Sequence, residues 1–188
     1  VPGLPILVNP VTHYLDTFEQ DQFSVELQVS GSAVGDRFSW LVGVYGFEED
    51  GENINPVDFT TVSIQSGGYF DYSSEAAFAQ ATFDFTEKLS ATAGIRYTKE
   101  DRDYLPDQYI EEMPLGGLPF PCFNPDGSTK VCALGDRVVP FETVNNSISE
   151  STPMLSISYS LTDDVMLYGT YSEGFKVGGF TQRIFPPE

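Results

Sequence analysis

The sequence is poor in basic residues and has no long apolar run. It contains nine Lys and Arg against 28 Asp and Glu, which gives a formal net charge of −19 at pH 7. Neutralising nucleic-acid phosphates requires Lys and Arg, so this balance argues against nucleic acid as a partner. It also argues against a basic patch that docks on an anionic lipid surface. No apolar run reaches the length of about 18 residues that a membrane-spanning helix needs.

Residues for catalysis are equally scarce. His13 is the one histidine, and no Ser, Cys or Asp accompanies it in a recognisable catalytic arrangement. The sequence around Gly178 and Gly179 does not match a phosphate-binding loop, and no CxxC spacing suggests a metal site. We therefore expect a protein that is not an enzyme, with no catalytic residue, no cofactor and no metal.

The two ends lack the features of natural termini. The sequence begins at Val1 rather than Met, with no signal peptide, and it ends in Pro186-Pro187-Glu188 just after a strand-like segment. We expect a fragment of a longer chain, the alternative being a truncated reading frame.

The two cysteines, Cys122 and Cys132, lie in one irregular stretch that is rich in Pro and Gly. Such a pair predicts a disulfide in an oxidising compartment. The alternative is a pair of free thiols without a role.

Six segments show the apolar–polar alternation of β-strands. Short connections join 23–31 to 37–47, 75–85 to 89–99, and 148–161 to 165–175, whereas the stretches 48–73 and 103–144 are long and irregular. In an up-and-down meander every second connection lies at the same end. The pattern thus predicts an all-β, antiparallel meander of about six long strands, with short turns at one rim and two long loops at the other. This asymmetry is typical of an outer-membrane β-barrel.

The alternation also predicts two distinct faces. Phe23, Val25, Leu27 and Val29 alternate with polar residues, and similar apolar rows lead across three-residue turns at 86–88 and 162–164. In a barrel the polar residues would face the lumen, and Glu26, Gln28, Asp84 and Arg96 are the lumen-facing candidates. A soluble β-sandwich is the mirror image, with the apolar face inside. Strands of about ten residues, the number that crosses a bilayer, favour the barrel.

One segment resembles a known family closely. Residues 167–180 read LYGTYSEGFKVGGF, which resembles a strand-to-loop segment of TonB-dependent outer-membrane receptors. The matching positions are Tyr171, Gly174, Phe175, Lys176, Gly178, Gly179 and Phe180. Residues 78–98 and 23–45 resemble further hairpins of that family, so that the resemblance covers most of 22–180 outside the long loops.

The resemblance implies a barrel of about 22 strands, closed by a plug domain, in the bacterial outer membrane. Such receptors import siderophores, cobalamin, haem or glycans. The partners would be outer-membrane lipid, a small-molecule nutrient, and the TonB complex acting through a plug that residues 1–188 lack. Six strands cannot close a membrane barrel, of which the smallest have about eight, so the chain would be a partial barrel. The alternatives are a passive porin-type barrel and a secreted, glycan-binding β-sandwich.

We expect the loops 48–73 and 103–144 to be extracellular and to make the first ligand contacts. Loop aromatics can stack on sugars or on planar ligands, although they can also pack the loops together. The candidates are Tyr69, Tyr72, Tyr104, Tyr109, Phe120 and Phe123. The acidic run 48–52 reads as a solvated loop, and capture of a cation by its carboxylates is left open.

Overall fold

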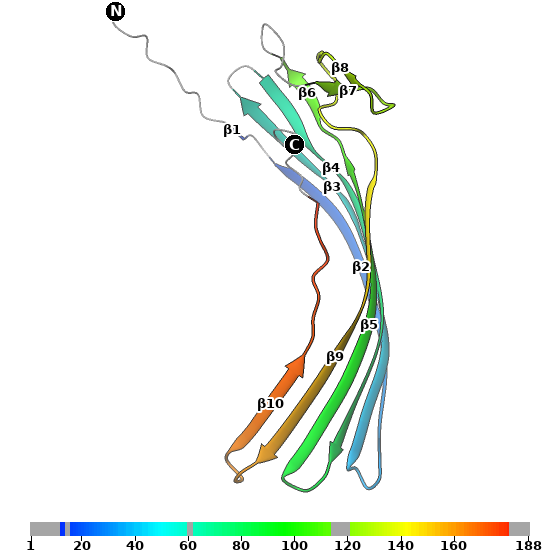
Figure 1. The fold of residues 1–188 in the computed structure, drawn as a ribbon, viewed down its shortest axis with the longest axis vertical. Helices are drawn as coiled ribbons and strands as arrows, with labels where there is room; N and C mark the ends of the chain where they lie inside the picture. Colours follow the sequence, from blue (N-terminus) through cyan, green and yellow to red (C-terminus); the bar gives the residue numbers. More distant parts are fainter. Residues whose placement is uncertain (1–11, 14–15, 60–61, 114–120, 181–188) are drawn as a thin grey trace, which may run out of the picture.

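The computed structural model describes residues 12–13, 16–59, 62–113 and 121–180 (Figure 1). Eight strands, six of them long or of medium length, form a single bowed sheet, and a separate two-stranded sheet lies at one of its ends. No helix within the described residues is long and apolar enough to cross a membrane. The strands are β1 (Thr12–His13), β2 (Thr17–Ala33), β3 (Phe38–Phe59), β4 (Val62–Asp84), β5 (Leu89–Pro106), β6 (Tyr109–Glu112), β7 (Cys122–Phe123), β8 (Thr129–Lys130), β9 (Val144–Ser160) and β10 (Met166–Ser172).

The sheet is an antiparallel meander in the order β2, β3, β4, β5, β9, β10. The short β1 pairs with the far end of β3, and β6 pairs with the start of β4. The predicted all-β meander is therefore confirmed. It is an open sheet, as expected for part of a barrel.

The short turns all lie at one end of the sheet, as predicted (Figure 1). The Phe85 N–H donates to the Leu89 carbonyl at 2.9 Å, and the Leu161 N–H donates to the Val165 carbonyl at 2.9 Å. These bonds close the predicted three-residue turns at 86–88 and 162–164. The Thr86 hydroxyl accepts a hydrogen bond from the Leu89 N–H at 3.0 Å and supports the first turn.

The expectation that 48–73 is an irregular loop was wrong. β3 continues to Phe59 and β4 begins at Val62, so that most of this stretch is a long β-hairpin. The strands of 22 and 23 residues greatly exceed the roughly ten that cross a bilayer. The parts of these strands that extend beyond the bilayer need no apolar face. Their sequence therefore loses the apolar–polar alternation, although the hydrogen-bonded ladder continues. The stretch 103–144 likewise holds the end of β5 and the strands β6, β7 and β8.

The register separates two faces of the sheet. Val29, Val42, Ala79 and Ile95 are partners in four neighbouring strands. This apolar face is open to the surroundings, since Val29 is 61% exposed and Ile95 is 55% exposed. The described residues place no second layer of strands on it. The sheet thus presents a broad apolar surface that a soluble sandwich would have to cover.

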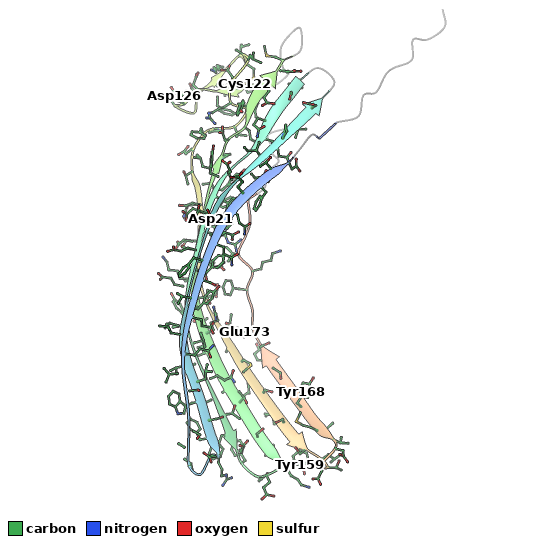
Figure 2. All side chains as sticks on the ribbon, turned by 180° about the vertical axis from the view of Figure 1, so that it is seen from behind. Asp21, Cys122, Asp126, Tyr159, Tyr168 and Glu173 are labelled. Carbon is green, nitrogen blue, oxygen red and sulfur yellow. A yellow bond between two sulfur atoms is a disulfide. The ribbon has the colours of Figure 1, made fainter. Side chains whose placement is uncertain are left out.

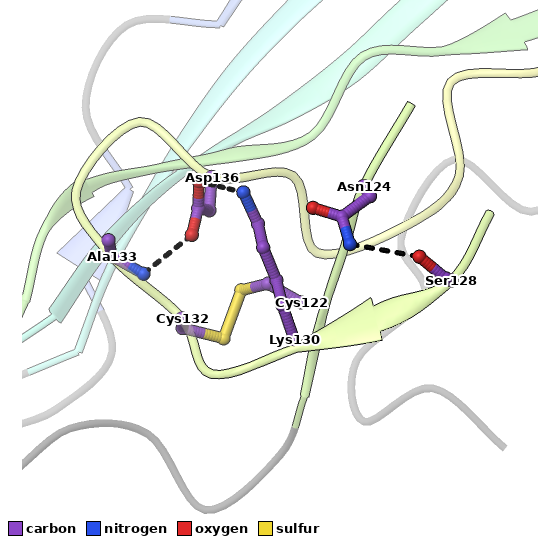
Figure 3. Close-up of polar contacts among 7 residues, drawn as sticks. All are labelled: Cys122, Asn124, Ser128, Lys130, Cys132, Ala133 and Asp136. Atoms are coloured by element: carbon purple, nitrogen blue, oxygen red, sulfur yellow. Dashed lines mark hydrogen bonds and ion pairs between the residues drawn. A yellow bond between two sulfur atoms is a disulfide. The ribbon is translucent and has the colours of Figure 1, made fainter. Parts of the chain in front are cut away.

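A small separate core lies at the end opposite the short turns, where what we call the knob, residues 107–113 and 121–143, packs against the start of β4. Cys122, which is labelled in Figure 2, forms a disulfide with Cys132 there, with an S–S distance of 2.08 Å (Figure 3). Apolar side chains pack around it. The core consists of Ile64, Ile110, Cys122, Cys132 and Val138, with Val62 packed against it.

Asp136 holds together the segment of the knob that follows β8 (Figure 3). Its carboxylate accepts hydrogen bonds from Lys130 Nζ at 2.6 Å and from the Ala133 N–H at 2.7 Å. The Lys130 hydrogen bond is the larger of the causes that hold the pKa of Asp136 below its ordinary value.

Candidate functional site

The polar face lies opposite the apolar one, on the side crossed by the C-terminal residues. The register places Glu26, Gln28, Asp84 and Arg96 on this face, because each lies out of phase with the apolar rows. Gln28 and Arg96 belong to one row, which runs from β2 through Gly43 and Phe78 to β5. That these residues face a barrel lumen stays a prediction.

Arg96 lies at the centre of this face, held between aromatic rings. Its Cζ atom is 5.2 Å from the centroid of the Tyr45 ring and 5.5 Å from that of Phe78, within the range of cation–π contact. Its Nε donates to the Thr98 hydroxyl at 3.2 Å. No described carboxylate forms an ion pair with Arg96. A fixed guanidinium without a counter-ion is suited to binding an anionic or hydrogen-bond-accepting group.

The place of Phe78 depends on a glycine. A Cβ atom at Gly43 would lie 2.4 Å from Phe78 Cζ and 2.9 Å from the Leu27 carbonyl oxygen. Only glycine therefore leaves room for the Phe78 ring over β3, where the ring contacts Arg96.

Arg102 lies six residues further along β5, away from the short turns, and is also stacked on a ring. Its Cζ is 5.2 Å from the Tyr72 centroid, and its Nη2 pairs with Glu100 at 3.4 Å. A hollow of about 550 Å³ lies over these residues, and its lining from the sheet includes Tyr45, Tyr72, Arg96, Arg102 and Thr152 together with the carboxylates of Glu49 and Glu100. Residues 173–175 line it from the other side.

Residues 173–180, which we call the strap, carry no regular secondary structure and cross the polar face (Figures 1 and 2). The Glu173 N–H donates to the Pro153 carbonyl at 3.0 Å, and Asn146 Nδ2 donates to the Gly178 carbonyl at 3.3 Å. Val177 is buried, and Phe180 stacks on Tyr104 with centroids 5.6 Å apart. Of the family-like positions, Tyr171 lies in β10, whereas Gly174, Phe175, Lys176, Gly178, Gly179 and Phe180 belong to the strap.

Tyr104 forms the floor under the end of the strap. It is 3% exposed, and its hydroxyl has no hydrogen-bond partner within the described part of the chain. Burial raises its pKa to about 12, so the hydroxyl stays neutral at physiological pH.

The candidate aromatic residues do not form one cluster. Tyr72 lines the hollow and Tyr104 lies beneath Phe180, whereas Tyr69 is 45% exposed and belongs to the opposite face. Tyr109 and Phe123 belong to the knob, in β6 and β7. Phe120 lies outside the described residues.

Three residues of this site, Tyr45, Phe78 and Arg102, were not predicted from the sequence. The turn at 86–88 could have placed Phe78 beside Arg96, since the pairing of Phe85 with Leu89 fixes that register. The sequence gives no such turn for Tyr45. Its place beside Arg96 depends on the register between β3 and β4, and the connection between these strands lies in a stretch whose sequence resembles an irregular loop.

Acidic residues gather on the apolar side of the sheet, beyond its apolar rows. Asp21, Asp50, Asp71 and Asp103 form one row across four strands, and like charges opposite one another are destabilising. Glu49 lies on the other face of the sheet, so the carboxylates of residues 48–52 do not point towards one place. Among the described residues no group of three or more His, Cys, Asp or Glu is placed to hold a metal ion.

An open antiparallel sheet with long strands, one apolar face and one polar face defines the class: a segment of the wall of a β-barrel. The family model described as TonB dependent receptor-like, beta-barrel, matches residues 7–187, and the chain belongs to this family.

A solved structure shows the same fold. The chain is similar to the ferric yersiniabactin uptake receptor FyuA from Yersinia pestis, with 16% sequence identity and a TM-score of 0.61. The match covers 82% of this chain and 21% of FyuA, so the chain spans about a fifth of the length of that receptor. No curated protein matches the sequence significantly.

Proposed function

We propose that this chain forms part of the wall of an outer-membrane receptor that takes up a scarce nutrient through the TonB complex. Family membership is the observation that carries the proposal. The two faces of the sheet support it, since an apolar face suits outer-membrane lipid and a polar face suits a lumen. A plug domain would connect the barrel to TonB.

The nutrient would be of the siderophore, cobalamin, haem or glycan class. A siderophore is the first candidate, because the structural relative is a ferric yersiniabactin uptake receptor. Arg96 and Arg102, each stacked on a ring, would contact polar groups of the ligand as it passes the polar face. In the outer half of the sheet, Tyr69 of β4 and knob residues such as Tyr109 and Phe123 would make the first contacts outside the cell.

Uptake and its energy source test this proposal together. Cells that carry or lack the gene are supplied with a ferric siderophore, cobalamin, haem or an oligosaccharide as the limiting nutrient, with and without functional TonB. We expect one nutrient to support growth only when both the gene and TonB are present. Gene-dependent uptake that persists without TonB would identify a passive porin-type barrel instead.

Solubility tests the remaining alternative. A barrel requires detergent or lipid, because its apolar face would otherwise aggregate in water. If the protein stays monomeric in water without detergent and binds glycans, it is a secreted β-sandwich and the transport proposal is wrong.

A further inference from the structure

β9 has a free edge beside the strap. β10 ends at Ser172, opposite Met154, although β9 itself begins ten residues earlier, at Val144. The β9 residues 144–152 therefore pair with β5 on one side and with no described strand on the other. Hydrogen-bonded pairs alternate along an antiparallel ladder, so the N–H and C=O groups of Ser147, Ser149 and Ser151 point to this free edge.

The ladder between β9 and β10 stops at a proline. The Glu173 N–H donates to the Pro153 carbonyl at 3.0 Å, which is one bond of the next pair in the register. Pro153 has no N–H with which to form the second bond. The strap begins at this half-formed rung, where pairing is weakest.

The strap nevertheless has the pattern of a strand that fits the free edge. Extending the β10–β9 register would place Phe175 and Val177 on the apolar face, in phase with Tyr171. The same extension would place Lys176 directly opposite Glu150 on the polar face. Opposite charges at such cross-strand positions stabilise pairing. Three hydrogen-bonded pairs would form, at Ser151, Ser149 and Ser147.

The observed contacts of the strap exclude that pairing. Val177 is buried at 5% exposure, and Phe180 stacks on Tyr104. Val177 cannot keep its buried position over the polar face and lie on the apolar face at once. The same residues thus have two sets of favourable contacts that are mutually exclusive.

We propose that residues 173–180 are a strap with two positions. In the first position the strap crosses the polar face and covers the hollow over Arg96 and Arg102. In the second it pairs with β9, lengthens β10 and uncovers the hollow. The strap would regulate access to the site of the proposed transport function. The two positions of the strap do not depend on that function. Only the identity of the ligand that enters the hollow rests on it.

Disulfide trapping tests the two positions in the outer membrane, in the protein expressed from its own gene. Glu150→Cys with Lys176→Cys reports the position along β9, and Tyr104→Cys with Phe180→Cys reports the position across the polar face. Glu150→Cys with Phe180→Cys is the matched control, since this pair is apart in both positions. We expect both reporter pairs to oxidise at least about tenfold faster than the control, as adjacent thiols have a high effective concentration.

Either reporter pair alone would overturn the proposal. Cross-linking only between positions 104 and 180 means a strap fixed across the face, and cross-linking only between 150 and 176 means an ordinary strand. This assay does not measure uptake. Failed cross-linking would therefore contradict the two-position strap and leave the transport proposal unaffected. Failed uptake would contradict the transport proposal and leave the two-position strap unaffected.

A charge exchange provides a second measurement without engineered disulfides. The readout is the rate at which an impermeant maleimide labels Thr152→Cys, a residue that lines the hollow. Lys176→Glu should slow labelling, because it places like charges opposite each other, and adding Glu150→Lys should restore the rate. Equal rates in all three proteins would contradict the two-position strap.

Discussion

An arginine placed in the middle of the apolar face is the sharpest test of which face meets lipid. Val29 is 61% exposed and lies in the apolar row with Val42, Ala79 and Ile95. An arginine on the lipid face near the bilayer midplane costs about 2–4 kcal/mol of folding free energy. Val29→Arg should therefore lower the ratio of folded to unfolded protein roughly 30- to 700-fold.

Two neighbouring positions on the same strand serve as controls. Val25 lies in a row that already holds Glu75 and Lys99, which marks the rim of the apolar face. Val25→Arg should cost only about 0–1 kcal/mol, the value for the membrane interface. Gln28 points to the polar face, so Gln28→Arg should change stability by about 0.5 kcal/mol at most.

The assay is equilibrium unfolding by urea in lipid vesicles, comparing midpoints and slopes. The expected order of cost is Val29→Arg first, with the other two close to the unchanged protein. In the core of a soluble sandwich, the cost of an arginine substitution would not depend on depth in a bilayer. Equal costs for Val29→Arg and Val25→Arg, or a larger cost for Gln28→Arg, would refute the assignment of the faces.

Three further outcomes follow from individual contacts. Gly43→Ala should destabilise by about 1–3 kcal/mol through the clash with Phe78, whereas Gly46→Ala, whose Cβ would meet only Val25 Cγ1 at 3.6 Å, should be nearly neutral in the same urea titration. Cys122→Ser should loosen the knob by about 2–4 kcal/mol, seen as faster amide exchange at Ile110 with the sheet unchanged. The depressed pKa of Asp136 means that its contribution is complete above about pH 4 and disappears as the pH falls through the lowered pKa. Protease cleavage of the knob should rise on acidification, and Asp136→Asn should flatten this dependence.

The half of the sheet near the short turns could be predicted from the sequence. There the apolar alternation of residues such as Leu27 and Val29 and the three-residue turn at 86–88 agree on one register, which the structure confirms. The disulfide between Cys122 and Cys132 is also present in the structure. These features depend on local patterns that a single sequence records.

The other half could not be predicted, because its determinants are not local. The outer parts of β3 and β4 carry charges and glycines in place of an apolar face, and only the neighbouring strands hold them extended. The strap was hidden for a different reason: Phe175 and Val177 continue the strand pattern, while Pro153, twenty residues earlier, interrupts the pairing. The ring cluster around Arg96 joins β3, β4 and β5, and therefore required the register of the whole sheet.

Contact between the apolar face and acyl chains is the central claim, and Trp40 reports on it directly. Trp40 is the one tryptophan of this sequence and lies on the apolar face, where a Cβ on Gly31 would be 2.9 Å from its Cζ2 atom. The measurement is fluorescence quenching by lipids brominated on their acyl chains, taken as the difference between the protein and its Trp40→Phe variant. We expect strong quenching by the acyl-chain bromines and little by aqueous iodide, whereas quenching by iodide alone would show that the apolar face does not meet acyl chains.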